Sequence, residues 1–476
     1  MTPNCSYRHT TPYLFRISAI IVLFISLIQA QQFDASKASR ISGTPARHSE
    51  EWIRHAVIYE IYPRAFSAEG TFAGIERKLP ELKSLGVTVL WIMPVHPVGI
   101  EKRKGKLGSP YSVRDYYAIN PEFGTLKDFK HLVDRSHRMG FHLIMDLVAN
   151  HTSWDSQLIH DHPEWFTKDS AGNIVSPVPD WSDVADLNYS NSGLRQYMIT
   201  MMKYWVEIIG IDGFRCDVAD MVPLDFWEEA RASLDSIKPV LMLSESARPD
   251  HHERAFDLTY SWNLYGLLAK LISGSLSAQQ LGELLHAEDT TYPIHSLLLR
   301  FSSNHDENAW DNSDVVKFGE RGAKLAAVIV NTIPGVPLVY NGQEAGNTQK
   351  LPLFEKTTIT WNDTSKFRQM YVSLFKLRRL HPALSGESWQ TIQTNNDSTV
   401  YAFERAAEKD TLIIVYNFSR FPFTGVLNFS NLKLFTKSEV HLVVAFTGEK
   451  LKFRLTNEKR VAVKIPKTGY RIFVVE

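Results

Sequence analysis

The sequence has little cysteine and no excess of charge of either sign, and it lacks a long hydrophobic run after its first 30 residues. Of its two cysteines, Cys5 lies in the N-terminal segment, so Cys216 would be the only cysteine of a processed chain and no internal disulfide is expected. Lysine plus arginine number 52, as do aspartate plus glutamate, so the net charge is zero. This balance argues against a nucleic-acid partner.

The N-terminus has the pattern of a secretory signal peptide. Arg8 and Arg16 precede the apolar stretch 17–28, and Ala30 is a small residue after which cleavage is expected. The apolar stretch is shorter than the roughly 20 residues that a transmembrane helix needs. We therefore predict a signal peptide over residues 1–30, a secreted or periplasmic product, and no membrane span in the mature chain.

Short apolar runs alternate with segments of helical period from about residue 56 to residue 381. The runs are apolar throughout, which is typical of parallel strands that are buried on both faces. One intervening segment carries an apolar stripe over 194–209, and Thr125 with Asp128 indicates the start of another helix. The pattern favours a (β/α)8 TIM barrel, with a doubly wound open sheet as the alternative. The predicted strands are 56–61, 87–93, 141–146, 213–217, 240–245, 256–259, 297–302 and 337–340.

Two regions depart from this alternation. A long connection rich in Trp, Asp and Pro follows the third predicted strand, and β-type runs separated by turn residues follow Pro382. The chain is therefore expected to divide into five parts. These are a signal peptide (1–30), a linker (31–50), a catalytic barrel (51–381) with an inserted domain (152–192), and a C-terminal all-β domain (382–476).

Polar side chains end four of the predicted strands. Because barrel active sites lie at the carboxyl ends of the strands, we expect these side chains to gather at one rim. Each alone is also compatible with a turn or a helix cap, but three carboxylates, an arginine and two histidines on four strands indicate a site. The residues at these ends are Asn150 and His151, Arg215 and Asp217, Glu245, and His305 and Asp306.

In their order along the chain, these four segments resemble the signature of the α-amylase family, glycoside hydrolase family 13. The segments 57–66, 185–188 and 335–344 are also similar to family motifs. The resemblance covers about residue 56 to the C-terminus. It implies a barrel, a small domain B, a β-sandwich domain C, and hydrolysis of an α-glucan such as starch or maltodextrin.

The resemblance also implies roles for individual residues. Asp217 corresponds to the nucleophile of a retaining mechanism, Glu245 to the general acid/base and Asp306 to the stabiliser of the transition state. Arg215 lies two residues before Asp217 on the same strand face, so its charge can keep the nucleophile ionised. In the substrate site, His151 and His305 correspond to a pair that binds one glucose unit, and Tyr111 to the ring that stacks beneath it.

No cofactor is required by this chemistry, and calcium binding is left open. Asn150 matches a position that ligates calcium in many α-amylases, and its side-chain carbonyl is a suitable hard donor. Those enzymes usually have a Lys-His pair after the nucleophile, and here Asp220 and Met221 stand in its place.

Substrate preference is predicted from two positions that point in different directions. Gly108 stands where exo-acting α-glucosidases often have an Asp, which favours an open cleft and internal cleavage of α-1,4 bonds. Val218 is typical of members that cleave α-1,6 bonds. The alternatives are an exo-α-glucosidase, an oligo-1,6-glucosidase, a transglycosidase, and a carbohydrate- or partner-binding relative without activity. The three carboxylates argue against the last, and the oligomeric state stays open.

Overall fold

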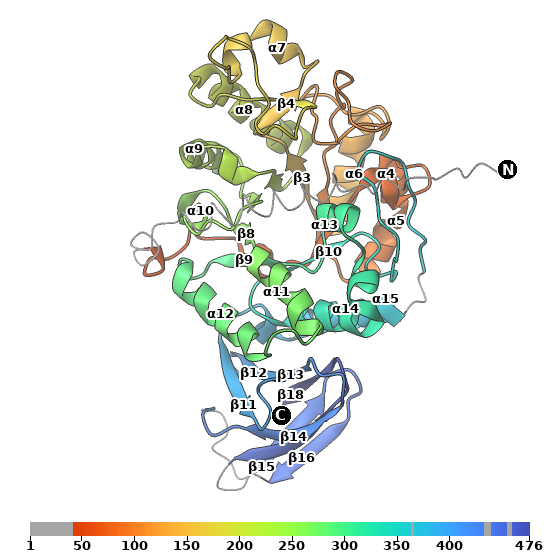
Figure 1. Cartoon of the computed structure of the whole chain (residues 1–476), viewed down its shortest axis with the longest axis vertical. Helices are drawn as coiled ribbons and strands as arrows, with labels where there is room; N and C mark the ends of the chain where they lie inside the picture. The colour runs from red at the N-terminus through yellow and green to blue at the C-terminus, as the bar shows by residue number, and fades with distance from the viewer. Residues whose placement is uncertain (1–40, 363–365, 433–438, 455–458) are drawn as a thin grey trace, which may run out of the picture.

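Eight parallel strands close into a barrel at the centre of the larger part of the molecule, with helices around it (Figure 1). The computed structural model of the chain describes residues 41–362, 366–432, 439–454 and 459–476. Neighbouring strands follow the order β1-β10-β9-β8-β7-β6-β3-β2. All eight predicted barrel strands are confirmed, and closure of the sheet excludes the doubly wound alternative. The strands are β1 (Ile58–Ile61), β2 (Val89–Ile92), β3 (His142–Leu147), β6 (Gly213–Cys216), β7 (Leu241–Ser244), β8 (Leu258–Tyr260), β9 (Leu297–Arg300) and β10 (Val336–Tyr340).

Both faces of these strands are buried, which explains why their sequences are apolar throughout. In β1, Ile58 packs inside the barrel, whereas Tyr59 packs in the layer between the strands and the helices. The same alternation places Cys216 in the helix-facing layer, where it is a buried free thiol, as expected for a small core residue. Its neighbour Arg215 consequently faces the barrel interior.

The helices pack around the outside of the barrel. The predicted start at Thr125 is confirmed, since Thr125 and Asp128 form a capping box at the first turn of α6. The predicted stripe 194–209 is helical throughout and passes from α8 into a π-helical turn, Trp205–Ile209. The helices of this part are α3 (Glu51–Arg54), α4 (Pro63–Phe66), α5 (Phe72–Leu85), α6 (Leu126–Arg138), α8 (Ser192–Tyr204), α9 (Leu224–Asp235), α10 (His251–Arg254), α11 (Trp262–Ile272), α12 (Gln279–Thr291), α13 (His305–Trp310), α14 (Asp314–Thr332) and α15 (Lys366–Leu380).

The long connection after β3 forms a small subdomain beyond the end of the barrel, at the top of Figure 1. Its strands β4 (His151–Ser153) and β5 (Val184–Asp186) pair antiparallel, with His151 opposite Asp186. Helix α7 (Gln157–Asp161) and the 3-10 turn Pro163–Trp165 lie between them. This pairing fixes the position of His151 relative to the barrel.

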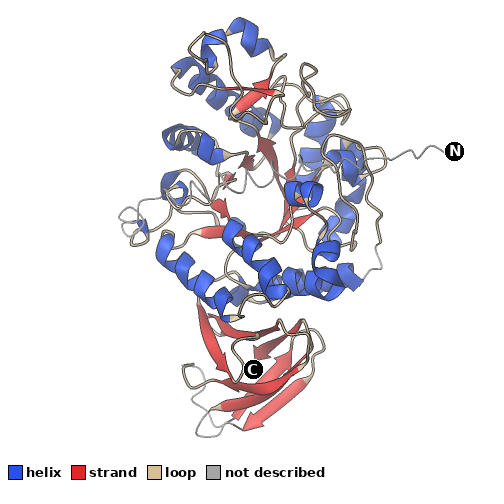
Figure 2. Cartoon of the chain, viewed as in Figure 1, coloured by secondary structure: helices blue, strands red, loops and turns tan. Residues whose placement is uncertain are grey.

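The C-terminal part is all-β, as predicted, and Figure 2 shows its strands as a separate layered unit below the barrel. Its apolar core contains residues from the middle of the sheet and from its edge, such as Ile413 of β13 and Val463 of β17. Arg405 joins this part to the barrel, because its buried guanidinium donates to the carbonyl of Thr332 at 2.7 Å. The strands are β11 (Trp389–Thr394), β12 (Val400–Ala407), β13 (Asp410–Asn417), β14 (Phe423–Asn428), β15 (Glu439–Val444), β16 (Lys450–Arg454), β17 (Arg460–Ile465) and β18 (Gly469–Val475).

The predicted signal peptide, residues 1–30, lies outside the described residues. Within the described ranges, no helix is both long and apolar enough to cross a membrane.

Candidate active site

Polar side chains from several strands meet inside the barrel at the carboxyl end of the sheet. The register places Asp146 of β3 directly beside Arg215 of β6, and β6 pairs in turn with β7. Asp217 and Glu245 are the residues that follow β6 and β7. Because alternate residues share a strand face, Arg215 and Asp217 point to the same side. The barrel thus gathers residues that are far apart in the sequence.

Arg215 lies at the centre of this group and is completely buried. Its Nη1 donates to Oδ1 of Asp146 and to Oδ1 of Asp217, both at 2.8 Å, and its Nη2 lies 2.7 Å from Oε2 of Glu245. Burial opposes the charge of the guanidinium, but the surrounding carboxylates outweigh burial and raise the pKa of Arg215. One fixed cation therefore contacts carboxyl groups from three strands.

Asp217 and Glu245 form a coupled pair of carboxyl groups. Burial raises the pKa of both, and for Asp217 the neighbouring Glu245 carboxylate raises it further, although Arg215 opposes this. Two adjacent carboxyls cannot both ionise easily, so the pair keeps one proton to a higher pH than an ordinary carboxyl does. Such a pair can act as an acid and a base within one site.

The residue after Asp217 has an unusual backbone conformation. Val218 has a φ of 36° and a ψ of 48°, the left-handed region that β-branched residues rarely adopt. In this conformation its backbone N–H donates to Oε2 of Glu245 at 2.8 Å. Local strain of this kind persists where the surrounding structure holds it and often accompanies functional sites. Here it links the ends of β6 and β7.

His305 begins α13 and connects Asp306 to the barrel interior. Its Nδ1 lies 2.5 Å from Oε1 of Glu60, and its Nε2 lies 3.1 Å from Oδ2 of Asp306. Burial alone would lower the pKa of His305, but the charges of Asp306 and Glu60 outweigh it and raise that pKa well above its usual value. Burial also raises the pKa of Glu60, although His305 opposes this, so the imidazole lies between two carboxyl groups that favour its protonated form.

The same contact explains the ionisation of Asp306. Burial opposes its charge, but the adjacent His305 cation outweighs burial, and the pKa of Asp306 is lowered. The pKa of Asp306 is thus shifted in the direction opposite to those of Asp217 and Glu245, which favours ionised Asp306 beside a more easily protonated pair.

Tyr111 and His151 form the side of the site nearest the inserted subdomain. The Tyr111 hydroxyl lies 2.7 Å from Nε2 of His305, and the two rings stack with centroids 5.3 Å apart. Burial lowers the pKa of His151 to about 4, although a hydrogen bond with the Tyr111 backbone partly offsets the effect. His151 also contacts the ring of Trp181, with centroids 5.5 Å apart. The structure thus brings every predicted substrate residue to one place, with one neutral and one charged histidine.

Two members of the group were not predicted to have a role. Glu60 and Asp146 are fully buried carboxylates that hold His305 and Arg215 respectively. Each is a charged residue inside an otherwise apolar strand, and this feature of the sequence could have indicated a role in the site.

The described contacts of Asn150 are with its neighbour His151 and with the inserted subdomain. The amide nitrogen of Asn150 is 3.3 Å from Nδ1 of His151, and its backbone carbonyl accepts the N–H of Leu187 at 3.1 Å. Within the described ranges, no three His, Cys, Asp or Glu side chains gather so that they could hold a metal ion. Calcium ligation by Asn150 therefore finds no support in this geometry and stays a prediction.

Gly108 has a structural reason to be glycine. Its φ is +77°, and a Cβ atom there would lie 2.7 Å from a side-chain methyl carbon of Val98. Its carbonyl accepts a hydrogen bond from the buried Arg64 at 2.7 Å. The backbone thus accounts for this glycine, and its presence alone does not establish an open cleft.

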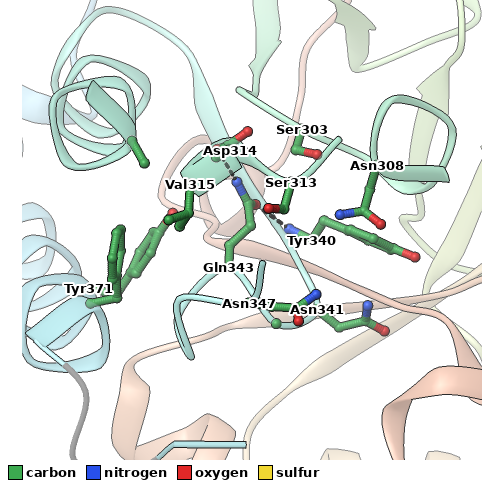
Figure 3. A pocket seen from close by; sticks show the side chains of 13 residues that line it. Ser303, Asn308, Ser313, Asp314, Val315, Tyr340, Asn341, Gln343, Asn347 and Tyr371 are labelled. Atoms are coloured by element: carbon green, nitrogen blue, oxygen red, sulfur yellow. Dashed lines mark hydrogen bonds between the residues drawn. The ribbon is translucent and has the colours of Figure 1, made fainter. Parts of the chain in front are cut away.

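A small cavity lined by polar and apolar side chains lies between the ends of β9 and β10 and the start of α14 (Figure 3). Gln343 crosses it, donating to Oδ2 of Asp314 and accepting the backbone N–H of Tyr340, each at 2.7 Å. The volume of the cavity, about 10 Å³, suits a single water molecule and is too small for a sugar. The cavity supports the loops after β9 and β10 and is not the substrate site.

A β/α barrel with paired carboxyl groups at the carboxyl ends of its strands has the arrangement of a glycoside hydrolase. Comparison with known proteins agrees. The family described as "Alpha amylase, catalytic domain" matches residues 28–391. Among curated relatives, α-amylase 3 of Dictyoglomus thermophilum is 27% identical over 88% of this chain and 95% of its own length. α-Amylase MalA of Haloarcula japonica is 28% identical over 78% of this chain, which spans only 57% of that relative.

Solved structures give the same result. The maltogenic α-amylase AmyB of Thermotoga neapolitana is 34% identical, with a TM-score of 0.82 over 89% of this chain and 99% of its own. An α-amylase of Lactobacillus plantarum is 30% identical, with a TM-score of 0.77 over 89% of this chain and all of its own. The chain belongs to the α-amylase family, whose members are glycoside hydrolases that act on O-glycosyl bonds.

Proposed function

We propose that the protein is a secreted, retaining α-glucan hydrolase that cleaves the α-1,4 bonds of starch or maltodextrin. The observation that carries this proposal is the single guanidinium of Arg215, which contacts both Asp217 and Glu245. Retaining hydrolysis needs two carboxyl groups about 5–5.5 Å apart, one to attack and one to protonate the leaving oxygen. Two carboxyls held by one guanidinium are neighbours of this kind.

In the first step, Asp217 attacks the anomeric carbon while Glu245 protonates the glycosidic oxygen. Arg215 binds Oδ1 of Asp217, which leaves Oδ2 to form the bond. Oε2 of Glu245 receives both the Arg215 contact and the Val218 N–H, so we place the transferred proton on Oε1. The glycosidic C–O bond breaks, the leaving sugar departs with that proton, and a glycosyl ester on Asp217 remains.

In the second step, water hydrolyses this ester. Glu245, now ionised, takes a proton from the water, whose oxygen attacks the anomeric carbon and releases Asp217. Two inversions return the α configuration. Asp306 stabilises the sugar as positive charge develops on it, because the His305 cation holds this carboxylate ionised and in position before the reaction begins.

We assign the remaining contacts to binding of the glucose unit at the reacting centre. Tyr111 supplies the ring beneath that unit, and His151 and His305 bind its hydroxyls. His151 is neutral and so can either donate or accept, whereas the charged His305 only donates. We further propose the division of the chain given above, with residues 1–30 removed on export.

The preferred bond is tested by product analysis. Internal α-1,4 cleavage predicts that maltoheptaosides blocked at the non-reducing end are cut and that starch–iodine colour falls faster than glucose appears. Intact blocked substrates together with rapid hydrolysis of maltose would indicate an exo-α-glucosidase. Val218 and the similarity to neopullulanase 2 of Thermoactinomyces vulgaris, 24% identical over 77% of this chain, make an α-1,6 substrate such as panose the necessary comparison. Sugar products longer than the substrate would indicate transglycosylation.

A further inference from the structure

Trp310 is the last residue of α13, and its side chain is more exposed to solvent than is usual for a tryptophan. Its side chain is 48% exposed, whereas Trp91, Trp205 and Trp227 are fully buried. Helix α13 begins with His305 and Asp306, so Trp310 lies one helical turn from the proposed transition-state stabiliser. Figure 1 shows this helix at the rim of the barrel.

Trp310 is contacted at its ring and at its backbone. Its ring meets the edge of Phe354, with centroids 5.7 Å apart and an interplanar angle of 67°. The amine of Lys350 donates to the Trp310 carbonyl at 3.2 Å. The loop that carries Phe354 is itself tied to the barrel rim, because the Phe354 carbonyl accepts the N–H of Leu107 at 2.9 Å.

The indole also reaches the reacting groups. Burial opposes the charge of Asp306, the His305 cation favours it most strongly, and a side-chain hydrogen bond with Trp310 favours it further. Because the indole nitrogen is the only polar atom of the ring and can only donate, this hydrogen bond turns the N–H edge toward Asp306. The remaining apolar surface of the ring accounts for its exposure to solvent.

We propose that Trp310 is a stacking platform for a glucose unit of the α-glucan, next to the unit that reacts. The inference rests on the proposed function and adds a binding position to it. A ring held by its polar edge loses little freedom when a sugar packs on its open face, and aromatic surfaces of this kind suit the apolar C–H face of a glucose ring. No motif of the sequence analysis identified this residue.

The test uses Trp310→Ala and Trp310→Phe in the full chain, with Phe421→Ala as the control. Phe421 is an aromatic residue of the C-terminal part that is 76% exposed. Kinetics are measured on maltose, maltotriose and maltoheptaose. We expect Trp310→Ala to raise KM for maltoheptaose about five- to tenfold, with a smaller effect on maltose. Trp310→Phe keeps a flat ring but loses the N–H donor to Asp306, so it should recover most of the rise in KM but not any accompanying fall in kcat.

A binding measurement separates this inference from the proposed function. Maltoheptaose is titrated into Asp217→Asn and into the same variant with Trp310→Ala, by calorimetry. Weaker binding of the double variant supports the platform even if the wild type hydrolyses another glucan. Equal binding by the two proteins would overturn it, and so would kinetic losses that are the same for every substrate length or for the alanine and phenylalanine variants. If no form of the protein binds or cleaves α-glucans, the proposed function is wrong and the stacking platform for an α-glucan is excluded with it.

Discussion

The Glu60–His305 pair offers a prediction that depends on the charge state inside the barrel. Glu60 is fully buried, His305 is 1% exposed, and Nδ1 and Oε1 are 2.5 Å apart. Glu60→Gln preserves the shape and leaves an amide oxygen that still accepts the Nδ1 proton, so only the negative charge is lost. A hydrogen bond that involves a charged group contributes about 1.5–3 kcal/mol, more than a neutral one, and removing one member of a buried ion pair is costly. We expect Glu60→Gln to lower the free energy of unfolding by about 2 kcal/mol near pH 6.

The pH dependence fixes the sign of this effect. Asp306 and Glu60 raise the pKa of His305 in the folded protein despite burial, whereas in the unfolded chain its pKa is about 6.5. The stabilisation is therefore complete below about pH 6.5 and is lost as the pH rises through the folded-state pKa. The difference in the free energy of unfolding between wild type and Glu60→Gln should therefore shrink as the pH rises from about 6 toward about 9, which is roughly two to three units above the pKa of the unfolded chain. The rate constant kcat/KM should fall about tenfold near pH 6, because a less charged His305 holds the Asp306 carboxylate less firmly in its ionised form.

The assay is urea unfolding followed by circular dichroism at the two pH values, with Glu229→Gln as the matched control. Glu229 pairs with Arg195 at 3.2 Å on the surface, where its side chain is 51% exposed. Loss of an exposed pair changes stability by less than about 1 kcal/mol. If Glu60→Gln is as stable as the control near pH 6, or if its deficit grows with pH, the pair is not charged as described.

Three further predictions concern the proposed chemistry and its requirements. Asp217→Asn and Glu245→Gln should each lower kcat on maltoheptaose by several orders of magnitude with little change in circular dichroism; near wild-type rates would exclude these roles. Arg215→Lys keeps a charge but loses the planar fork that contacts both carboxyl groups, so kcat should fall far more than Tm does, whereas unchanged kinetics would make Arg215 a packing residue. Calcium ligation by Asn150 predicts that treatment with EDTA lowers Tm and that added calcium restores it; an unchanged Tm would exclude a structural calcium ion.

The barrel was predictable because each of its strands is buried on both faces and is therefore apolar over its whole length. In the C-terminal part, the β-type runs of the sequence are 400–404, 411–417, 439–446, 460–465 and 470–474, which correspond to β12, β13, β15, β17 and β18. The strands β11, β14 and β16 were not predicted, and their sequences show the reason. Trp389–Thr394 and Lys450–Arg454 alternate with polar or charged residues, and Phe423–Asn428 contains a glycine. Such segments are indistinguishable from loops without knowledge of the strands that pair with them.

The site was predictable to the extent that its residues follow strands in recognisable order. The contact between Glu60 and His305 was not, since 245 positions separate them and only closure of the barrel brings β1 and the end of β9 together. The backbone conformation of Val218 also depends on tertiary contacts. Gly108 was interpreted from the sequence as a sign of an open cleft. In the structure its positive φ and the nearby Val98 explain the glycine without reference to substrate.

The central claim is that the reaction passes through a glycosyl ester on Asp217. This is tested by incubating the wild type with 5-fluoro-α-glucosyl fluoride, which slows breakdown of such an ester, followed by proteolysis and mass spectrometry. We predict a single peptide that carries one added fluoroglucosyl group on Asp217, and no labelling of Asp217→Asn. A label on another carboxylate, or steady turnover of the wild type with no labelled peptide, would contradict the assignment of Asp217 as the nucleophile.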